Sequence, residues 1–258
     1  MITNSIIEEN MLISIITAVY NAEDTIAETI QSVREGGYDH YEHIIIDGGS
    51  TDGTLDVVRS MQHDRLRWVS EKDEGIYDAM NKGIGMAGGD YIATLNADDY
   101  YVPGALEEVA RAIEKSNGAS VVHGNIMYLK NGREMIHTPP ITKRVYNEIH
   151  MPSLHPATFI KSDVYERYGS YNLDYKIAAD HDYLMNLYIH KEGFYYLNKV
   201  VTCMRWGGAS IQQWKLQHKE QRKIHRKYGV AFMKRLQFER LCLMAQIRSF
   251  VKSILVRR

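Results

Sequence analysis

Short apolar runs alternate with segments of helical periodicity along the first hundred residues. Each run is continuous enough for a strand buried on both faces of a sheet; they cover residues 11–18, 41–46, 66–69 and 91–95. Apolar residues at helical spacing lie between these runs, over residues 25–34, 55–61 and 76–82. This order predicts a parallel sheet of βαβ units with short connections and right-handed crossovers.

The later pattern continues with fewer strands and longer irregular stretches. A helix is predicted over residues 104–115 after Pro103, and a strand over 120–128 leads to Asn131-Gly132, a strong hairpin signal. Residues 138–156 look irregular. A further helix is predicted from the acidic cluster at 178–182, followed by a last strand. We expect that helix to reach about residue 191 and that strand to cover residues 194–204.

Polar side chains follow two of the buried strands at the point where each strand ends. Asp47 and Asp52 follow the second strand, and Asp98 and Asp99 follow the strand of residues 91–95. Either cluster alone could be turn chemistry, because Asp favours turns and helix caps. Together, at the carboxyl ends of parallel strands, they indicate a ligand site, and oxygen ligands suit Mg²⁺ or Mn²⁺ with phosphate oxygens.

The glycine-rich segment of residues 83–88, G-I-G-M-A-G, matches a dinucleotide-binding pattern only formally. Such a fingerprint must follow a strand and open a helix, whereas here it follows a predicted helix that its glycines are expected to end. The turn after the first strand, V-Y-N-A-E-D, contains no glycine for a phosphate cradle. We therefore reject the interpretation that the protein is a dehydrogenase.

Composition sets the class of protein. The 258 residues are 45% hydrophobic and 10% aromatic, enough for one large α/β domain with a tail. Two cysteines, Cys203 and Cys242, indicate a reducing compartment. We expect no secretory signal and no membrane-spanning segment, because the N-terminal residues lack a basic region and no run of about 18 apolar residues occurs.

The net charge of −1 hides a strong asymmetry. Residues 215–258 hold 13 Lys/Arg and 2 Asp/Glu, a net charge of +11, whereas residues 1–214 carry −12. Apolar residues recur in this basic tail at helical spacing, at Leu243, Ile247, Phe250, Val251, Ile254 and Leu255. Basic residues are set among them, at Arg248, Lys252, Arg257 and Arg258. Two interpretations stay open: a helix packed on its own domain or on a dimer mate, or an interfacial helix on anionic lipid.

Five ordered motifs carry a resemblance to a known family. They are S-I-I-T-A-V-Y-N-A, I-I-I-D-G-G-S-T-D-G-T, E-G-I-Y-D-A-M-N-K-G-I, G-D-Y-I-A-T-L-N-A-D-D and A-A-D-H-D-Y-L-M-N-L. In this order the chain resembles family 2 glycosyltransferases of the GT-A fold. The resemblance implies an open, mostly parallel, Rossmann-like sheet flanked by helices. It also implies a nucleotide-sugar-binding half (11–100) and an acceptor-binding half (101–210). Outside the residues that carry the resemblance, we expect a flexible N-terminus of residues 1–10 and a basic amphipathic helical segment (211–258).

The resemblance further implies inverting transfer from a nucleotide-sugar, usually a UDP-sugar, with Mg²⁺ or Mn²⁺, in bacterial polysaccharide biosynthesis. The acceptor would be a glycan or a polyprenyl-linked oligosaccharide. Asp180 would be the catalytic base and Asp98 the metal ligand. The implied donor-binding residues are Thr17, Ala18, Tyr20, Asn21, Asp47, Asp73, Asn81, Lys82, Asn96, Ala97 and Asp98.

Three further residues are candidates for the site: His155, Asp99 and Asp182. Asp180 and Asp182 stand two positions apart, so at most one of them can point into a cleft from a helix. His155 stands before Pro156 and could equally be a packing histidine.

The chain departs from the family pattern at three positions. Asn96 replaces the first acid of the D-x-D motif, Met80 stands where many members have Arg, and Ala179 replaces the Glu of a Glu-Asp pair. With Met80 there, Lys82 or Lys72 could supply a diphosphate contact. Two of these changes, Asn96 and Ala179, support an alternative, a non-catalytic nucleotide-binding or regulatory module. A glycoside hydrolase is a weaker rival, because it would use two flanking carboxylates and no nucleotide pocket.

We expect a cytoplasmic protein without a nucleic-acid partner. The basic tail would hold it peripherally at the inner face of the membrane, and a homodimer is the alternative use of that tail.

Overall fold

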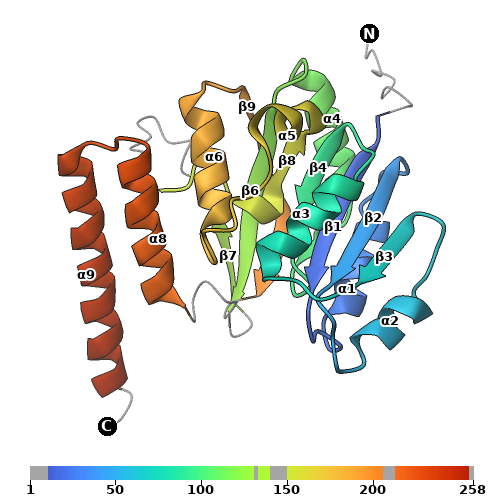
Figure 1. The fold of residues 1–258 in the computed structure, drawn as a ribbon, viewed down its shortest axis with the longest axis horizontal. Coiled ribbons are helices and arrows are strands. Elements are labelled where there is room, and N and C mark those ends of the chain that lie inside the picture. Colours follow the sequence, from blue (N-terminus) through green and yellow to red (C-terminus); the bar gives the residue numbers. More distant parts are fainter. Residues whose placement is uncertain (1–10, 131–132, 140–149, 206–212, 256–258) are drawn as a thin grey trace.

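One nine-stranded sheet flanked by helices forms the body of the protein (Figure 1). The structure is a computed structural model that describes residues 11–130, 133–139, 150–205 and 213–255, with side chains described as far as Met244. The strands are β1 (Ile13–Val19), β2 (Tyr41–Asp47), β3 (Leu66–Ser70), β4 (Tyr91–Thr94), β5 (Tyr100–Tyr101), β6 (Val121–Lys130), β7 (Arg133–His137), β8 (Thr158–Lys161) and β9 (Phe194–Arg205). The helices are α1 (Ile26–Arg34), α2 (Thr54–Ser60), α3 (Ile76–Met86), α4 (Ala105–Lys115), the 3₁₀ turn η2 (His155–Ala157), α5 (Ser162–Tyr168), α6 (Ala179–Ile189), α8 (Trp214–Lys227) and α9 (Phe232–Leu255).

The predicted α/β class and the parallel first half of the sheet are confirmed. Strands run in the order β3-β2-β1-β4-β8-β6-β9-β5, and the four strands β3, β2, β1 and β4 are all parallel. Beyond them the sheet is mixed, because β8 runs antiparallel to both β4 and β6, while β6 and β9 are parallel. All four parallel strands therefore end at the same edge.

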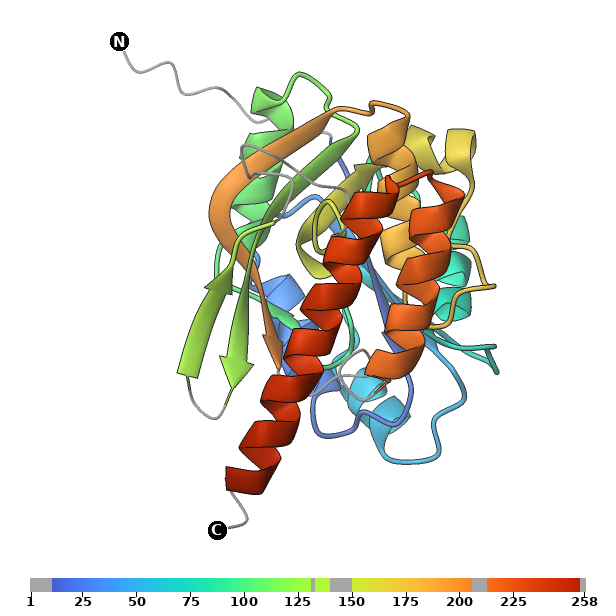
Figure 2. The ribbon, with the colours of Figure 1, turned by 90° about the vertical axis from the view of Figure 1, so that its left-hand side faces the viewer.

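The sheet is covered on both faces, which explains its continuous apolar runs. Helices α3, α5, α6 and α8 contribute to a core on one face, and α1, α2 and α4 pack on the other. Helix α8 lies between α6 and α9 at one end of the molecule (Figure 1), and the far end of α9 extends beyond the body (Figure 2).

The prediction that the glycines of residues 83–88 end the third helix is wrong in detail. Helix α3 runs through Gly83 and Gly85 to Met86. A Cβ on Gly83 would stand 2.3 Å from Cγ2 of Ile16 on β1, so glycine lets this helix pack directly on the sheet. The turn comes only at Ala87, before Gly88.

Some predictions concern residues beyond those described. They are the flexible N-terminus of residues 1–10, the turn Asn131-Gly132, and the tail side chains from Ile247 to Arg258 named above. The hairpin itself is confirmed by its strands, because β6 and β7 pair antiparallel with Lys130 opposite Arg133. Within the described residues, no helix is both long and apolar enough to cross a membrane.

Candidate active site

The loops that leave β1, β2, β3 and β4 meet at the carboxyl edge of the parallel strands. Most of the residues implied by the family resemblance lie on these loops or at the strand ends. The structure brings them to one edge, as parallel pairing requires.

Asp47 at the end of β2 is fully buried and holds two loops together. Its carboxylate accepts hydrogen bonds from the Ser70 hydroxyl at 2.6 Å and from the backbone N–H groups of Gly49 and Ser50, both at 3.1 Å. A buried carboxylate needs such partners because its desolvation is costly. Asp47 therefore fixes the shape of this edge.

Asn21 joins the β1 loop to the β2 loop. It has a left-handed backbone (φ 47°), and its side-chain oxygen accepts the N–H of Thr51 at 2.8 Å. Beside it, Tyr20 is 62% exposed at the edge. Thr17 and Ala18 lie buried in β1 beneath this loop, and the Thr17 hydroxyl is 2.9 Å from Nε2 of His43. Tyr20 and Asn21 are thus at the surface of the edge, and Thr17 and Ala18 support it.

Asp73 lies against the β2 loop. Its Oδ1 accepts the N–H of Gly75 at 2.9 Å, and a Cβ on Gly48 would come within 2.4 Å of its Oδ2. This contact requires glycine at position 48 and keeps the Asp73 carboxylate at the edge.

Asn81 and Lys82 on α3 have partners inside the protein. The Asn81 amide donates to the carbonyl of Tyr171 at 2.8 Å and accepts the N–H of the same residue at 2.9 Å. The Lys82 ammonium is 2.9 Å from Glu71 and donates to the carbonyl of Lys72 at 2.9 Å. In this conformation Asn81 joins two segments of the fold, and the Lys82 charge is neutralised.

The segment from Asn96 to Asp99 follows β4. The Asp98 side chain is partly exposed, Ala97 is buried, and Arg205 at the end of β9 donates to the Asp98 carbonyl at 2.6 Å. Asp99 is buried and accepts a hydrogen bond from the Asn96 amide at 2.9 Å. Burial, with the neighbouring Asp98 carboxylate, raises the pKa of Asp99 to about 7.

Asp180 lies in the first turn of α6 and is held by two side chains. Oδ1 accepts the hydroxyl of Tyr77 at 2.8 Å, and Oδ2 is 3.0 Å from Nδ1 of His155. Burial acts to raise the pKa of Asp180, but the hydrogen bonds and charge of His155, aided by Tyr77, outweigh it and hold the pKa below its usual value. Asp180 is therefore an ionised carboxylate at neutral pH.

Asp182 faces elsewhere, as the helical spacing predicts. Both of its oxygens accept hydrogen bonds from the Lys227 ammonium on α8 at 2.8 Å. Asp182 thus ties α6 to α8, and Asp180 is the carboxylate that meets His155.

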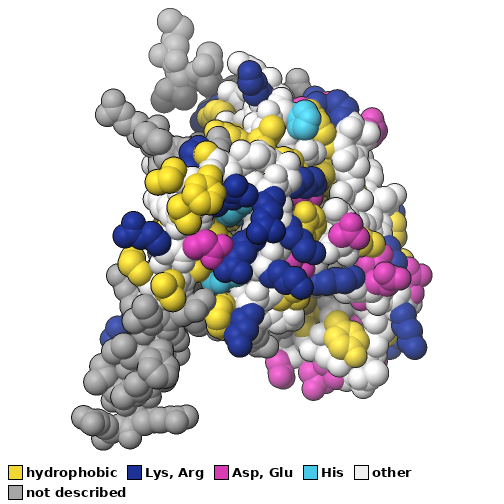
Figure 3. All heavy atoms as spheres, turned by 60° about the vertical axis from the view of Figure 1, so that its left-hand side comes forward, with side chains coloured by type: hydrophobic (Ala, Val, Ile, Leu, Met, Phe, Trp, Pro, Cys, Tyr) yellow, Lys and Arg dark blue, Asp and Glu magenta, His cyan; other side chains and the backbone are white. Residues whose placement is uncertain are grey.

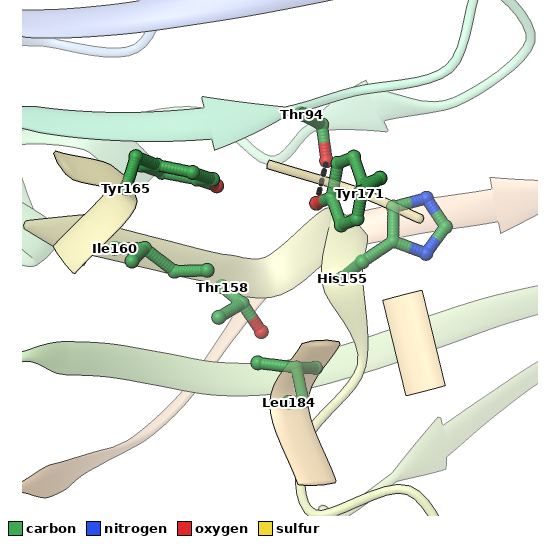
Figure 4. Close-up of a pocket in the computed structure, with 7 residues that line it drawn as sticks. All are labelled: Thr94, His155, Thr158, Ile160, Tyr165, Tyr171 and Leu184. Atoms are coloured by element: carbon green, nitrogen blue, oxygen red, sulfur yellow. Dashed lines mark hydrogen bonds between the residues drawn. The ribbon is translucent and has the colours of Figure 1, made fainter. Parts of the chain in front are cut away.

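A small recess lies beside this carboxylate (Figure 4). It is lined by Thr94, His155, Thr158, Ile160, Tyr165, Tyr171 and Leu184. Both ring nitrogens of His155 lie on the side of the ring away from Tyr165 and Ile160 (Figure 4), and Nε2 is buried without a hydrogen-bond partner among the described residues. His155 is thus part of the site through its contact with Asp180.

The sequence analysis does not predict three residues near the site. Tyr77 stands inside the E-G-I-Y-D motif, whose presence is the one available signal. Arg205 ends a strand far away in sequence. Glu220 on α8 is buried and accepts three successive backbone N–H groups, those of Lys176, Ile177 and Ala178, at 2.8–3.0 Å. This carboxylate fixes the segment that leads into α6.

The residues after β4 fit a divalent cation only in part. Oδ1 of Asn96 is buried without a partner among the described residues, and Asp98 offers a partly exposed carboxylate. Within the described ranges, no group of three His, Cys, Asp or Glu side chains could hold a metal. A cation here would therefore take most of its ligands from phosphate oxygens and water, as Mg²⁺ commonly does.

The fold and site define an α/β protein with a polar edge at the carboxyl ends of four parallel strands and a buried, ionised carboxylate beside it. The model of glycosyl transferase family 2 matches residues 14–171, more than half of the chain. The chain therefore belongs to family 2 of the glycosyltransferases, as the five motifs predict.

Curated relatives agree with this family. An uncharacterised glycosyltransferase of Mycobacterium tuberculosis is 33% identical over 176 residues, which are 67% of each chain. A PGL/p-HBAD biosynthesis glycosyltransferase of Mycobacterium bovis is 28% identical over 67% of this chain and 68% of its own length. The putative teichuronic acid biosynthesis glycosyltransferase TuaG of Bacillus subtilis is 34% identical over 50% of this chain and 53% of its own.

Solved structures share the fold. The S. aureus protein TarS, crystallised with UDP-GlcNAc, matches with a TM-score of 0.68 and 19% identity over 79% of this chain. The mannosyltransferase PcManGT of Pyrobaculum calidifontis, in complex with GDP-Man and Mn²⁺, matches with a TM-score of 0.64 and 18% identity over 82% of this chain. This chain spans 61% of the first structure and 62% of the second.

Proposed function

We propose that the protein transfers a sugar, with inversion, from a nucleotide-sugar to a hydroxyl of a glycan or polyprenyl-linked acceptor. The observation that carries this proposal is Asp180, a buried and ionised carboxylate at the site edge, held by His155 and Tyr77. Relatives named for PGL/p-HBAD and teichuronic acid biosynthesis support an acceptor of the cell surface.

We propose a UDP-sugar as donor. TarS, which has this fold, is solved with UDP-GlcNAc. The donor would lie on the edge made by Tyr20, Asn21, Asp47 and Asp73, with Asn96 to Asp98 next to its diphosphate. Arg205 lies against this segment and also pairs with Glu28.

We propose Mg²⁺ or Mn²⁺ as the cofactor, held by Asp98 and by the oxygen of Asn96. When bound, such a cation neutralises charge that develops on the leaving diphosphate. The Mn²⁺ complex of PcManGT is consistent with this choice.

Asp180 acts as the base in this proposal. As the acceptor oxygen bonds to the anomeric carbon, its proton passes to the Asp180 carboxylate, and the bond from carbon to the diphosphate oxygen breaks. Nucleoside diphosphate leaves, and a single displacement inverts the anomeric centre. Tyr77 and the N–H of His155 orient the carboxylate for this transfer.

A second candidate is a non-catalytic nucleotide-binding or regulatory module. The engaged side chains of Asn81 and Lys82 favour it, because neither is available to a donor in this conformation.

Turnover with UDP-sugars separates the two. The protein is incubated with a panel of UDP-sugars and Mn²⁺, and UDP release is followed. We expect slow hydrolysis of at least one donor, loss of that activity with EDTA, and its loss in Asp98→Ala with an unchanged circular dichroism spectrum. Tight UDP binding without release from any donor would favour the module, and unchanged Mn²⁺-dependent activity of Asp98→Ala would rule out Asp98 as the ligand.

We also propose a cytoplasmic location. Cys203 and Cys242 are both free thiols and both buried, which suits a reducing compartment.

A further inference from the structure

Helices α8 and α9 form a hairpin that presents one face to solvent, here named the α8–α9 face. It consists of Lys215, Lys219, Arg222, Lys223 and Arg226 of α8 with Phe232, Met233, Leu236, Arg240, Leu243 and Met244 of α9. Figure 3 shows Lys and Arg side chains gathered beside hydrophobic ones on this end of the molecule.

Helix α9 is apolar on two sides. One side packs inward: Phe238 and Cys242 are buried, and Phe238 lies edge-on to His225 of α8 with ring centroids 4.8 Å apart. The opposite side carries Phe232 and Met233, 64% and 73% exposed. Leu236 follows three residues after Met233, and Leu243 and Met244 follow seven and eight residues after Leu236. That spacing places all five on one side of a helix.

This exposure is unusual for a soluble surface. Large apolar side chains exposed singly are common, but five on one side of a helix, interrupted only by Arg240 among them, mark an interaction site. Within the described residues, nothing covers it.

The charge next to this apolar side is basic. Lys219, Lys223 and Arg226 are exposed and form no ion pair with any described residue. They project to one side of α8, away from Ile224 and Glu220, which are buried against the body. Basic and hydrophobic side chains are thus exposed together at this end of the molecule (Figure 3).

We propose that the α8–α9 face docks on an anionic lipid surface, with the apolar side chains of α9 in the interface and the basic groups of α8 among lipid headgroups. Basic residues on the polar side and Phe, Leu and Met on the other are the pattern of an interfacial helix. The hairpin would hold the site edge near a lipid-linked acceptor. Docking itself does not depend on the transfer reaction.

Two other occupants fit the face less well. A nucleic acid would use the basic groups but gain nothing from the five apolar side chains. A second copy of this chain would cover the apolar side but place the two basic sides near each other, which costs free energy through like-charge repulsion.

Vesicle sedimentation tests the proposal. The full chain is mixed with phosphatidylcholine vesicles that contain either no anionic lipid or 30% phosphatidylglycerol, at low and high salt. We expect binding to the anionic vesicles only, with a loss of at least tenfold at high salt because of screening.

Two variants test the basic and the apolar contributions to vesicle binding separately. The triple variant K219Q/K223Q/R226Q should bind anionic vesicles at least tenfold more weakly, since each basic residue near the surface contributes about fivefold at low salt. The variant M233S/L236S/M244S should also bind more weakly and keep less binding at high salt than the wild type. A matched control, R34Q/K115Q/K191Q, removes the same charge from exposed positions outside α8 and α9 and should bind like the wild type.

Several outcomes would overturn the proposal. They are full-length protein that ignores anionic vesicles at low salt, equal binding to neutral and anionic vesicles, or equal weakening by the control variant. A dimer in sedimentation velocity that dissociates in M233S/L236S/M244S, without vesicle binding, would assign the face to a second copy instead. UDP release from soluble donor should stay unchanged in all three variants, so a failure of docking is distinct from a failure of the proposed transfer.

Discussion

Asp180 and Asp182 stand two positions apart on α6 and meet different partners. Asp180 contacts His155 and Tyr77, whereas Asp182 binds Lys227 of α8. The same residue type therefore has two environments: the Tyr77 hydroxyl and the His155 ring contact Asp180, whereas the Lys227 ammonium contacts Asp182.

Asp180→Asn should keep UDP affinity and lower turnover by about 10²-fold or more, the usual scale for loss of a general base. The amide retains the shape but cannot take a proton. Binding is measured by calorimetry and turnover by product release.

Asp182→Asn should instead lower the free energy of unfolding by about 1 kcal/mol with little change in rate, because one partner of a hydrogen-bonded contact to α8 is weakened. Urea unfolding and turnover are measured on the same preparation. Reversed phenotypes for the two variants would assign the base to Asp182.

At the scale of elements, α8 is tied to the helix that carries Asp180. Glu220 accepts three backbone N–H groups just before α6, Lys227 binds Asp182, and Ile224 is fully buried in the core. These contacts make α8 part of the body of the protein rather than an appendage.

Glu220→Ala should leave three backbone N–H groups, that of Ala178 buried, without their acceptor and lower the free energy of unfolding by about 1–3 kcal/mol. It should also reduce kcat while the KM for the donor changes little, because the donor edge is on other loops. Glu220→Gln should restore part of both losses. A normal kcat in a folded Glu220→Ala protein would show that Glu220 contributes to stability and not to the rate of transfer.

Much of the element pattern could be predicted from sequence, because strands buried on both faces and helices with one apolar side leave periodic signals. The first four strands and their order of appearance follow from residues 11–95 alone. Predictions from local sequence failed where contacts between distant segments determine the structure. Gly83 stays in a helix because it packs on Ile16, and Asn81 binds the backbone of Tyr171, 90 residues away. Glu220 gives no signal at all, since its partners are backbone groups.

For the whole molecule, three buried histidines predict how stability depends on pH. Burial lowers the pKa of His43 and His181 to about 3 and that of His123 to about 4. The folded protein keeps these rings neutral, whereas the unfolded chain protonates them near pH 6.5. At these three sites the unfolded state therefore binds more protons below that pH, so they make stability fall as the pH falls from about 6.5 toward 4. Asp99, with its raised pKa of about 7, offsets about one of the three contributions.

Each histidine contributes a slope of up to about 1.4 kcal/mol per pH unit in that range. His123→Phe should remove one such contribution, because the ring lies between Phe194 and Tyr196 and phenylalanine suits the same contacts. His190→Gln, at an exposed position, should leave the slope unchanged. The free energy of unfolding in urea is measured from pH 4 to 8, and an equal slope in wild type and His123→Phe would contradict the assignment.

The bond between Glu220 and the segment before α6 also bears on how the enzyme is made. During synthesis the chain emerges from its N-terminus, so the parallel strands β1 to β4 and the loops that follow them emerge well before Glu220. Until α8 has been added, the N–H groups of Lys176, Ile177 and Ala178 lack the acceptor that fixes them. If the loops after β1 to β4 bind the donor as proposed, a nascent chain has its donor site before the segment that leads to Asp180 is fixed, and the order of translation delays the onset of transfer.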